Sequence, residues 1–216
     1  MTTPAFLSNA SRTPLFACAL LLLTGCLSSD AQRHAVTQKK SYALEAAKPA
    51  AVATAPRFGH LKILSFKSQP PYEANSLIVK RANGETVMDY YTTWIASPHD
   101  LIRVQSMNYL RDSGLFKAVY DSTSGSLAQA GLEGTIEGIF LDVRAEKPMA
   151  VITLRFTIID ETTTDFTMLW SSETTGQAEV DASGPLAMTS AFNKALTKAL
   201  EQLTRELEKA SLQQKK

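Results

Sequence analysis

The thiol of Cys26 is the side chain whose surroundings in the sequence most favour a covalent modification. It follows Leu23, Thr24 and Gly25, and a large apolar residue, two small residues and a cysteine form the pattern of a bacterial lipobox. The small pair lets the backbone enter a signal peptidase, and the thiol accepts diacylglycerol. We predict that Cys26 is the lipid-attachment residue; the alternative is a cysteine that follows an ordinary signal by chance.

The residues before Cys26 have the layout of a secretory signal peptide. Arg12 is the only charged side chain before Asp30, and an apolar run extends from Pro14 to Leu23. Such a run is too short to span a membrane, which takes roughly 20 residues, and it fits the roughly 7–15 residues of a signal-peptide core. We predict a lipoprotein signal peptide over residues 1–25, a flexible tether over residues 26–39 and a single domain over residues 40–212.

The residue after Cys26 predicts the membrane to which the chain is attached. This residue is Leu27, whereas Asp at that position usually retains Gram-negative lipoproteins in the inner membrane. We therefore expect the periplasmic face of the outer membrane, with the inner membrane less favoured. Two or three acyl chains such as palmitate would anchor the protein permanently, because each buried CH₂ contributes about 0.8 kcal/mol. Residues 27–39 could then span at most about 45 Å.

Charge and composition exclude several kinds of partner. Lys and Arg number 22 against 21 Asp and Glu, so the net charge of +1 provides no field that would attract nucleic acid. Two cysteines and three histidines provide neither a disulfide framework nor the material for a metal site. We expect no metal, no cofactor and no nucleic-acid partner.

The remaining residues that could do chemistry are better explained by structure. Neighbours on a helix point in different directions, so His99 and Asp100 make a poor acid–base pair, and Asp100 suits the first turn of a helix that Ser97 caps. His60 has no partner at ligand spacing, and the glycines of residues 131–138 lie within a strand pattern without a P-loop lysine. The acids are dispersed, and no serine lies in a nucleophile elbow. We therefore expect that the protein is not an enzyme.

Apolar periodicity predicts a mixed α/β fold, in which two main helices pack on a sheet that contains an antiparallel meander. Strands are expected at residues 42–44, 61–66, 76–81, 85–91, 115–120, 132–143, 149–160 and from 166 onward, and residues 46–57 form a linker. One helix begins at Ser97-Pro98 and ends before Gly114, and a second begins at Gly184-Pro185. Asn83-Gly84 predicts a two-residue hairpin, and Gly138 marks a bulge or a close backbone approach.

The same periodicity assigns the faces of these elements. On the first helix we expect a stripe of Leu101, Val104 and Asn108, with Met107 and Leu110 beside it. On residues 61–66 we expect Ser65 to share a face with Leu61 and Ile63. On strand 149–160, the side chains of Ile152, Leu154, Phe156 and Ile158 point inward, and those of Thr153, Arg155 and Thr157 point to water. The stripe of the second helix, which should cover the inward set, is Phe192, Leu196, Ala199, Leu200, Leu203, Leu207 and Ala210. With roughly 28 residues, about 40 Å, this helix is expected to extend beyond the sheet.

Residues 76–116 carry the most specific pattern in the chain. An apolar strand that ends at Arg81 is followed by a short hairpin, an aromatic return strand, Trp94 and a capped helix that stops at Gly114 before Phe116. This segment resembles the ABC-type transport auxiliary lipoprotein family, the lipoprotein components of MCE-domain transport systems that include the paraquat-inducible lipoprotein. The resemblance extends over residues 41–207 and includes the lipobox.

The resemblance implies a domain like the N-terminal domain of TolB and a role in moving lipid between membranes. It implies that an MCE-domain protein, which bridges the periplasm, is the partner that this lipoprotein docks at the outer membrane, with a homo-oligomeric ring as a possible assembly. It implies no catalytic residues. The alternative is a lipoprotein activator of a periplasmic cell-wall synthase, which also pairs a tether with a small α/β domain. Three contact surfaces are expected: the water-facing side of the sheet, the end of the terminal helix and the strand edge at Lys80 and Arg81. At that edge, we favour a solvated or ion-paired pair of side chains over a phosphate clamp.

Overall fold

Strand β6 (Ala130–Asp142) organises the sheet, because both of its edges are paired in the computed structural model, which describes residues 38–50 and 52–212. On one edge it pairs antiparallel with β7 (Met149–Asp160), which in turn pairs antiparallel with β8 (Met168–Glu179). On the other edge its first half pairs parallel with β2 (Phe58–Ser68), and its last residues pair parallel with β3 (Ser76–Lys80). The meander that the sequence predicts is therefore confirmed.

The other three strands extend the two halves of that second edge. Strand β5 (Phe116–Asp121) lies parallel to β2. Strand β4 (Thr86–Trp94) pairs antiparallel with β3, and the short β1 (Lys40–Tyr42) pairs parallel with the end of β4. The described part of the chain thus forms one mixed sheet of eight strands.

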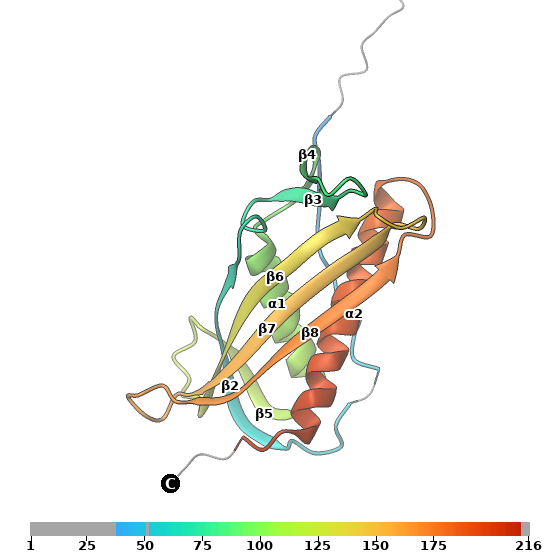
Figure 1. Ribbon diagram of the computed structural model, residues 1–216. Helices are drawn as coiled ribbons and strands as arrows, with labels where there is room; N and C mark the ends of the chain where they lie inside the picture. The colour runs from blue at the N-terminus through green and yellow to red at the C-terminus, as the bar shows by residue number, and fades with distance from the viewer. Residues whose placement is uncertain (1–37, 51, 213–216) are drawn as a thin grey trace, which may run out of the picture. The chain divides into compact units, whose positions relative to one another are not determined.

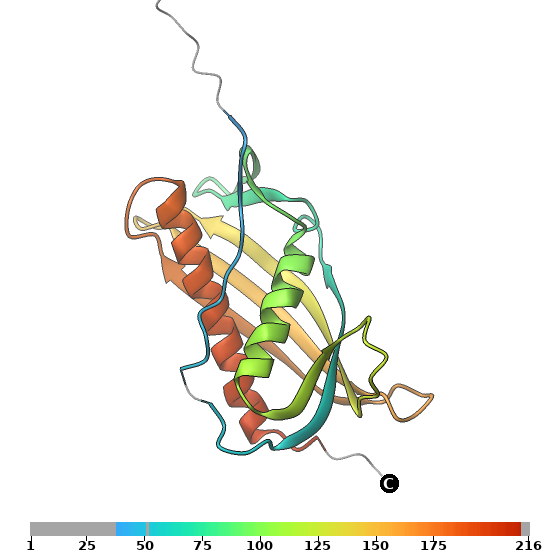
Figure 2. The same cartoon turned by 180° about the vertical axis from the view of Figure 1, so that it is seen from behind.

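Both helices lie on the same face of the sheet (Figures 1 and 2). Helix α2 (Pro185–Lys209) packs on β7 and β8, and α1 (Pro98–Asp112) packs on β2, β5 and β6. The predicted stripe of α2 is buried from Phe192 to Leu207, and it shares one core with Ile152, Leu154, Phe156 and Ile158 of β7. The opposite face carries no helix of the described residues, so it is the free face of the sheet.

The helix stripe predicted for α1 is wrong at Val104 and Asn108, which are exposed, whereas Leu110 beside it is buried. Val104 is 38% exposed, and the side chains that are buried are those of Ile102, Ser106, Tyr109 and Leu110. Ile102 and Tyr109 are seven residues apart and therefore lie two turns apart on one line. Because the apolar residues of α1 are spread around the helix, the sheet beneath it decides which line is buried.

The terminal helix was expected to extend beyond the sheet, but it does not. It has 25 residues, and its side chains are buried from Met188 to Leu207. Ala210 is the extended residue that ends the helix, not a member of the stripe. Because packing continues along nearly its whole length, α2 offers no free end as a contact surface.

Irregular pairing explains one further difference from the predictions and confirms one expected bulge. The register between β2 and β6 shifts between Ile63 and Phe66, so Phe66 is buried and Ser65 is exposed, the reverse of the prediction. A bulge inserts an extra residue, and one residue is enough to move the following side chains to the other face. The bulge expected at Gly138 is confirmed, because the register between β6 and β7 shifts between Ile136 and Gly138.

The hairpin between β3 and β4 is one residue longer than predicted. The backbone N–H of Arg81 donates to Glu85 at 2.9 Å, which leaves three residues in the loop. Gly84 has a φ of 85°, whereas a two-residue type I′ turn would require a positive φ at Asn83 as well. The loop is therefore a turn that ends in a glycine bulge.

The linker expected at residues 46–57 is an extended strap without helix or strand among its described residues. Backbone N–H groups of this strap and of Glu45 before it donate to side chains of both helices: Glu45 to Asn193, Ala46 to Gln105 and Ala47 to Thr197. The strap crosses the helical layer (Figure 2). Leu44, two residues before the strap, is 1% exposed and lies beyond β1 rather than within the first strand as predicted.

An ion pair between α1 and β5 gives a pH-dependent prediction. Arg103 Nη1 lies 2.6 Å from Asp121 Oδ2, and this hydrogen bond, with others from Thr123, holds the pKa of Asp121 well below its usual range. A lowered pKa stabilises the fold above the unfolded-state value near 3.9, and that contribution is lost as the pH falls below it. We expect Asp121→Asn to lower the free energy of unfolding by about 1 kcal/mol at pH 7, after allowance for solvent screening.

Urea denaturation at pH 7, 5 and 3 measures this effect. The difference between wild type and Asp121→Asn should be similar at pH 7 and 5 and should shrink at pH 3. Asp112→Asn, at the exposed end of α1, is the control. A difference for Asp121→Asn that stays constant down to pH 3 would contradict the role of the ion pair.

Candidate functional site

The predicted lipid-attachment residue Cys26, with Leu23, Thr24 and Gly25, lies outside the described residues, as does most of the tether. Within residues 38–50 and 52–212, no three His, Cys, Asp or Glu side chains are grouped so that they could hold a metal ion. In the same part of the chain, neither helix is long and apolar enough to cross a membrane. A functional surface must therefore be sought among the faces and edges of the domain.

The start of α1 brings together a serine, a histidine and an aspartate. Ser97 Oγ lies 3.3 Å from His99 Nε2, and the Ser97 hydroxyl also donates to the Asp100 carboxylate. In a Ser–His–Asp triad the carboxylate instead accepts from the second ring nitrogen of the histidine and orients it. Here that atom, His99 Nδ1, is buried without a hydrogen-bond partner, so the arrangement lacks the geometry of a triad.

The same contacts correct the expected helix cap. Ser97 occupies the N-cap position and Pro98 is the first helical residue, as predicted. However, no side-chain hydrogen bond caps the backbone, because the Ser97 hydroxyl is used by Asp100. The other histidine considered above, His60, packs its ring edge-on against Tyr120 with the ring centres 5.6 Å apart.

The free face of the sheet carries a ladder of polar cross-strand contacts. Arg155 of β7 is its centre: Nε lies 2.7 Å from Glu137 Oε1 on β6, and Nη2 lies 2.7 Å from Glu173 Oε2 on β8. The hydrogen bond with Glu137, more than that with Glu173, raises the pKa of Arg155. The outward positions predicted for β7 are therefore confirmed, and their partners come from strands on both sides.

Hydroxyl pairs continue the ladder on both sides of Arg155. Thr153 and Thr175 are 3.2 Å apart, and Thr157 and Ser171 are 3.3 Å apart. Directly opposite residues on antiparallel strands interact in this way, which holds each side chain in place. The result is a patterned polar surface with a fixed Arg and two Glu, and such a surface suits recognition of another polar protein face.

Toward β3 the free face becomes aromatic. The Tyr72 ring stacks on Phe140 with centres 6.2 Å apart, and Lys80 Nζ lies 3.6 Å above the Phe140 ring. Arg144 pairs with Asp142 at the end of β6 and lowers the pKa of Asp142 to about 2. A cation over an aromatic ring next to a polar ladder adds an anchor of the kind that protein interfaces use.

Lys80 and Arg81 are engaged separately, which favours the ion-paired interpretation of this edge over a phosphate clamp. Lys80 packs over Phe140, and Arg81 Nη1 lies 3.6 Å from Glu85 Oε2 within the hairpin.

Two of the glycines that the sequence predicts to be structural lie where no side chain would fit. A Cβ on Gly131 would lie 2.5 Å from the Leu64 side chain, and one on Gly134 would lie 2.4 Å from the Phe66 ring.

The outer edge of β8 is covered by side chains from α2, a feature that the sequence analysis missed. Lys198 Nζ donates to the backbone oxygen of Gln177 at 2.9 Å. The Gln202 amide accepts from the Thr175 N–H at 3.1 Å and donates to the Glu173 oxygen at 3.4 Å. A partner strand could add here only by displacing these groups. Polar residues at i, i+4 beside the apolar stripe were the sequence signal that could have revealed it.

A hollow of about 640 Å³ lies where β4, the β6–β7 turn and the start of α2 meet. Leu141, Pro148, Val180 and Met188 contribute apolar atoms to its wall, and Asp181 and Ser183 contribute polar ones. Its size is within the range of small-molecule sites. A hollow of this size and lining calls for a direct test of whether the protein holds a lipid.

No family model matches the sequence, and no curated protein matches it either. Among solved structures, protein XCC0632 from Xanthomonas campestris, described with the family model DUF330, is similar with a TM-score of 0.65 and 18% sequence identity, over 76% of this chain and 92% of that one. An uncharacterized protein is similar with a TM-score of 0.58 and 10% identity, over 79% and 99% of the two chains. The hypothetical protein CT253 from Chlamydia trachomatis is similar with a TM-score of 0.52 and 8% sequence identity, over 70% of this chain and 96% of that one.

These similarities concern the fold. Nearly the whole length of each solved protein is covered, so the described domain corresponds to a complete unit in all three. The mixed α/β class predicted from the sequence is confirmed by this likeness and by the sheet with its two helices.

Proposed function

We propose that the protein is a lipid-anchored auxiliary component of an ABC/MCE-type intermembrane lipid transport system. Cys26 carries the acyl chains in the periplasmic leaflet of the outer membrane, and the domain docks the periplasm-spanning MCE-domain protein there. The domain acts by binding and positioning, without catalysis. It works either singly or as a ring of identical subunits around the MCE partner.

The observation that carries the proposal is the resemblance of residues 76–116 to the auxiliary lipoprotein family. The order behind that resemblance is present in the structure as β3, β4 and α1, with Trp94 buried at 3% exposure and Gly114 at a φ of 70° after the helix. The lipobox and the tether support the same proposal. A shared fold alone would not, because one fold can host unrelated functions.

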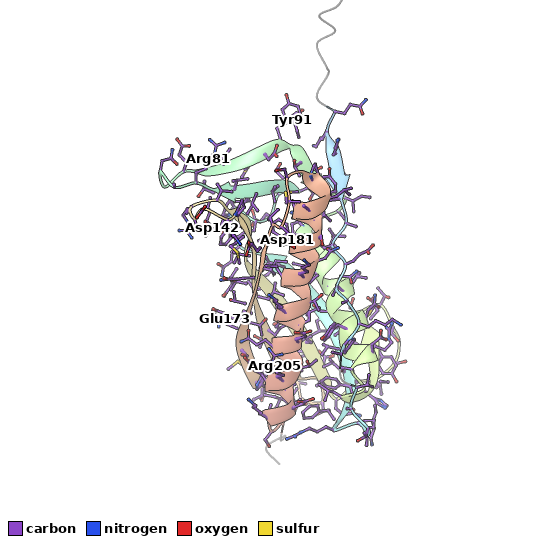
Figure 3. The ribbon with its side chains drawn as sticks, turned by 90° about the vertical axis from the view of Figure 1, so that its right-hand side faces the viewer. Arg81, Tyr91, Asp142, Glu173, Asp181 and Arg205 are labelled. Carbon is purple, nitrogen blue, oxygen red and sulfur yellow. The ribbon has the colours of Figure 1, made fainter. Side chains whose placement is uncertain are left out.

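The free face of the sheet is the surface we assign to docking. Its Glu137–Arg155–Glu173 ladder is held in place, so little side-chain freedom would be lost when a partner binds. The β8 edge is covered by α2, and α2 itself is packed on the core. Figure 3 shows Glu173 on the sheet side and Arg205 on the helix side of the molecule.

Site-specific photocrosslinking in cells tests the proposal. A photoreactive phenylalanine analogue at Thr157, which lies opposite Ser171 on the free face and two residues after Arg155, should crosslink to an MCE-domain protein, identified by mass spectrometry. The same analogue at Arg205, exposed on α2, is the matched control and should yield little of that product. We expect at least about a tenfold difference, because a buried interface excludes all but its own residues from contact.

The other outcomes have definite meanings. A cell-wall synthase crosslinked at Thr157 would overturn the transport proposal in favour of the alternative. Equal products from Thr157 and Arg205 would remove the free face as the docking surface. Organic extraction of the purified protein should yield no stoichiometric phospholipid; one phospholipid per chain, with no MCE partner, would instead indicate a lipid carrier that uses the hollow near Met188.

A further inference from the structure

A bulge of three residues interrupts β4 near its end. Pairing with β3 passes from Asp89, opposite Leu77, directly to Thr93, opposite Ser76, so residues 90–92 have no partner on β3. The Asp89 carboxylate closes this bulge, because Oδ1 accepts from the N–H of Tyr91 at 2.8 Å and from that of Thr92 at 3.3 Å. Side-chain acceptors of this kind replace lost ladder bonds, and bulges commonly serve to re-aim side chains.

The bulge presents large apolar side chains to the solvent. Tyr90 is 70% exposed and Tyr91 48%, and their rings meet edge to face with centres 5.3 Å apart. Met88 and Ile95, which flank them in sequence, are 53% and 65% exposed. Lys39 Nζ lies 5.4 Å from the centre of the Tyr90 ring. Single exposed apolar residues are common, but two exposed tyrosine rings in contact with each other, with a lysine beside one of them, indicate a binding surface.

This patch lies where the chain enters the domain from the predicted anchor. Strand β1, which follows Lys39, pairs with Thr92–Trp94 immediately beside the bulge. Figure 3 shows Tyr91 at this end of the domain, pointing away from the sheet and beside β1. Cys26 precedes Gln38 by 12 residues, which can reach at most about 40 Å. An acyl chain on Cys26 therefore keeps this end of the domain within reach of the bilayer.

We propose that the Tyr90–Tyr91 bulge is a membrane-interface contact whose rings lie among the phospholipid headgroups of the bilayer that holds the anchor. Tyrosine suits that depth because its ring is apolar and its hydroxyl remains hydrated. Met88 and Ile95 add apolar area, and Lys39 and Lys40 face lipid phosphates. The contact, which rests on the proposed acylation of Cys26, would set the orientation of the domain, so that the free face of the sheet stands off the membrane toward its partner.

A lipid surface fits this patch better than a second protein does. The chain outside the described residues joins the domain at the patch itself, so the bilayer is present at high local concentration once Cys26 is acylated. The patch also consists of only a few exposed apolar side chains beside Lys39, whereas stable protein interfaces bury roughly 800 Å² on each partner.

Fluorescence quenching by brominated phospholipids tests the contact. The processed, acylated protein is placed on vesicles of phosphatidylethanolamine and phosphatidylglycerol whose acyl chains carry bromine. Tyr90→Trp and Tyr91→Trp add reporters at exposed positions without changing the core. Leu127→Trp, 87% exposed in the loop before β6, is the control, because β6 runs about 40 Å from that loop toward β3. We expect the added tryptophan at residues 90 and 91 to be quenched about threefold more than that at residue 127.

Palmitate labelling of the same preparations separates this inference from the proposed function. Labelled protein whose tryptophans at 90, 91 and 127 are quenched equally would overturn the membrane contact and leave the anchor intact. Labelled protein whose Tyr90→Trp emission shifts only when the MCE-domain protein is added would also overturn it, because the occupant would then be a protein. Absence of palmitate from the wild type, with Cys26→Ser as its control, would overturn both the anchor and the contact.

Discussion

Gly176→Ala is expected to lower the free energy of unfolding by about 3 kcal/mol or more. Gly176 lies on β8 directly under α2, and a Cβ added there would be 1.8 Å from the backbone oxygen of Ala195 and 2.8 Å from the backbone nitrogen of Ala199. Both atoms belong to the helix backbone, so no side-chain rotation can make room. The helix would have to move off the sheet, and the whole row of buried contacts along it would loosen.

Urea denaturation followed by fluorescence measures this loss. Trp94 is a built-in reporter of helix docking, because its ring lies edge-on to Phe192 of α2 with centres 5.1 Å apart. Gly125→Ala is the matched control: a Cβ there would meet nothing within 4 Å, and we expect a change under about 0.5 kcal/mol. A Gly176→Ala protein as stable as the control would mean that α2 does not approach β8 this closely.

Leu200→Ala is expected to cost about 2–5 kcal/mol, and Leu200→Asp to prevent folding. Leu200 is 0% exposed in the middle of the buried stripe of α2. Its truncation leaves a cavity lined by rigid neighbours, and a carboxylate there would be buried away from water. The effect tests directly whether the amphipathic stripe read from the sequence is the element that holds the two layers together.

The control for this prediction lies on the same helix. Leu186 is 82% exposed in the first turn of α2, so Leu186→Ala removes the same atoms without removing buried contacts. We expect it to change the free energy of unfolding by less than about 0.5 kcal/mol. Denaturation curves in which Leu200→Ala loses no more than Leu186→Ala would show that the helix is not docked through this stripe.

The two proposed contact surfaces lie on different parts of the domain. The Tyr90–Tyr91 bulge is next to the point where the chain enters the domain, whereas the Arg155 ladder lies along the free face of the sheet. In the proposed membrane contact, the bulge would restrict the tilt of the domain on the bilayer, and the proposed docking face would be held in one orientation. A docking protein benefits from such an orientation, because less rotational freedom is lost when its partner binds.

The sequence by itself determined the elements whose signal is local. Strand β7 begins at Met149 and ends at Asp160 as predicted, since the alternation of apolar and polar residues from Ile152 to Ile158 leaves one register for its faces. The terminal helix begins at Pro185 with the predicted stripe, because one apolar line at helical spacing leaves one way to pack it. The polar side chains of the candidate docking face, Thr153, Arg155 and Thr157, were predictable for the same reason.

Only the tertiary structure decided which distant residues meet. Glu137 and Glu173 lie 18 residues on either side of Arg155, and nothing local in the sequence selects them from the dispersed acids. The rotation of α1 depends on the sheet beneath it, and the exposure of Ser65, Tyr90 and Tyr91 depends on bulges that arise from pairing between separate strands. A bulge adds one or more residues to one strand only, so its place is set by the partner strand and cannot be read from either strand alone.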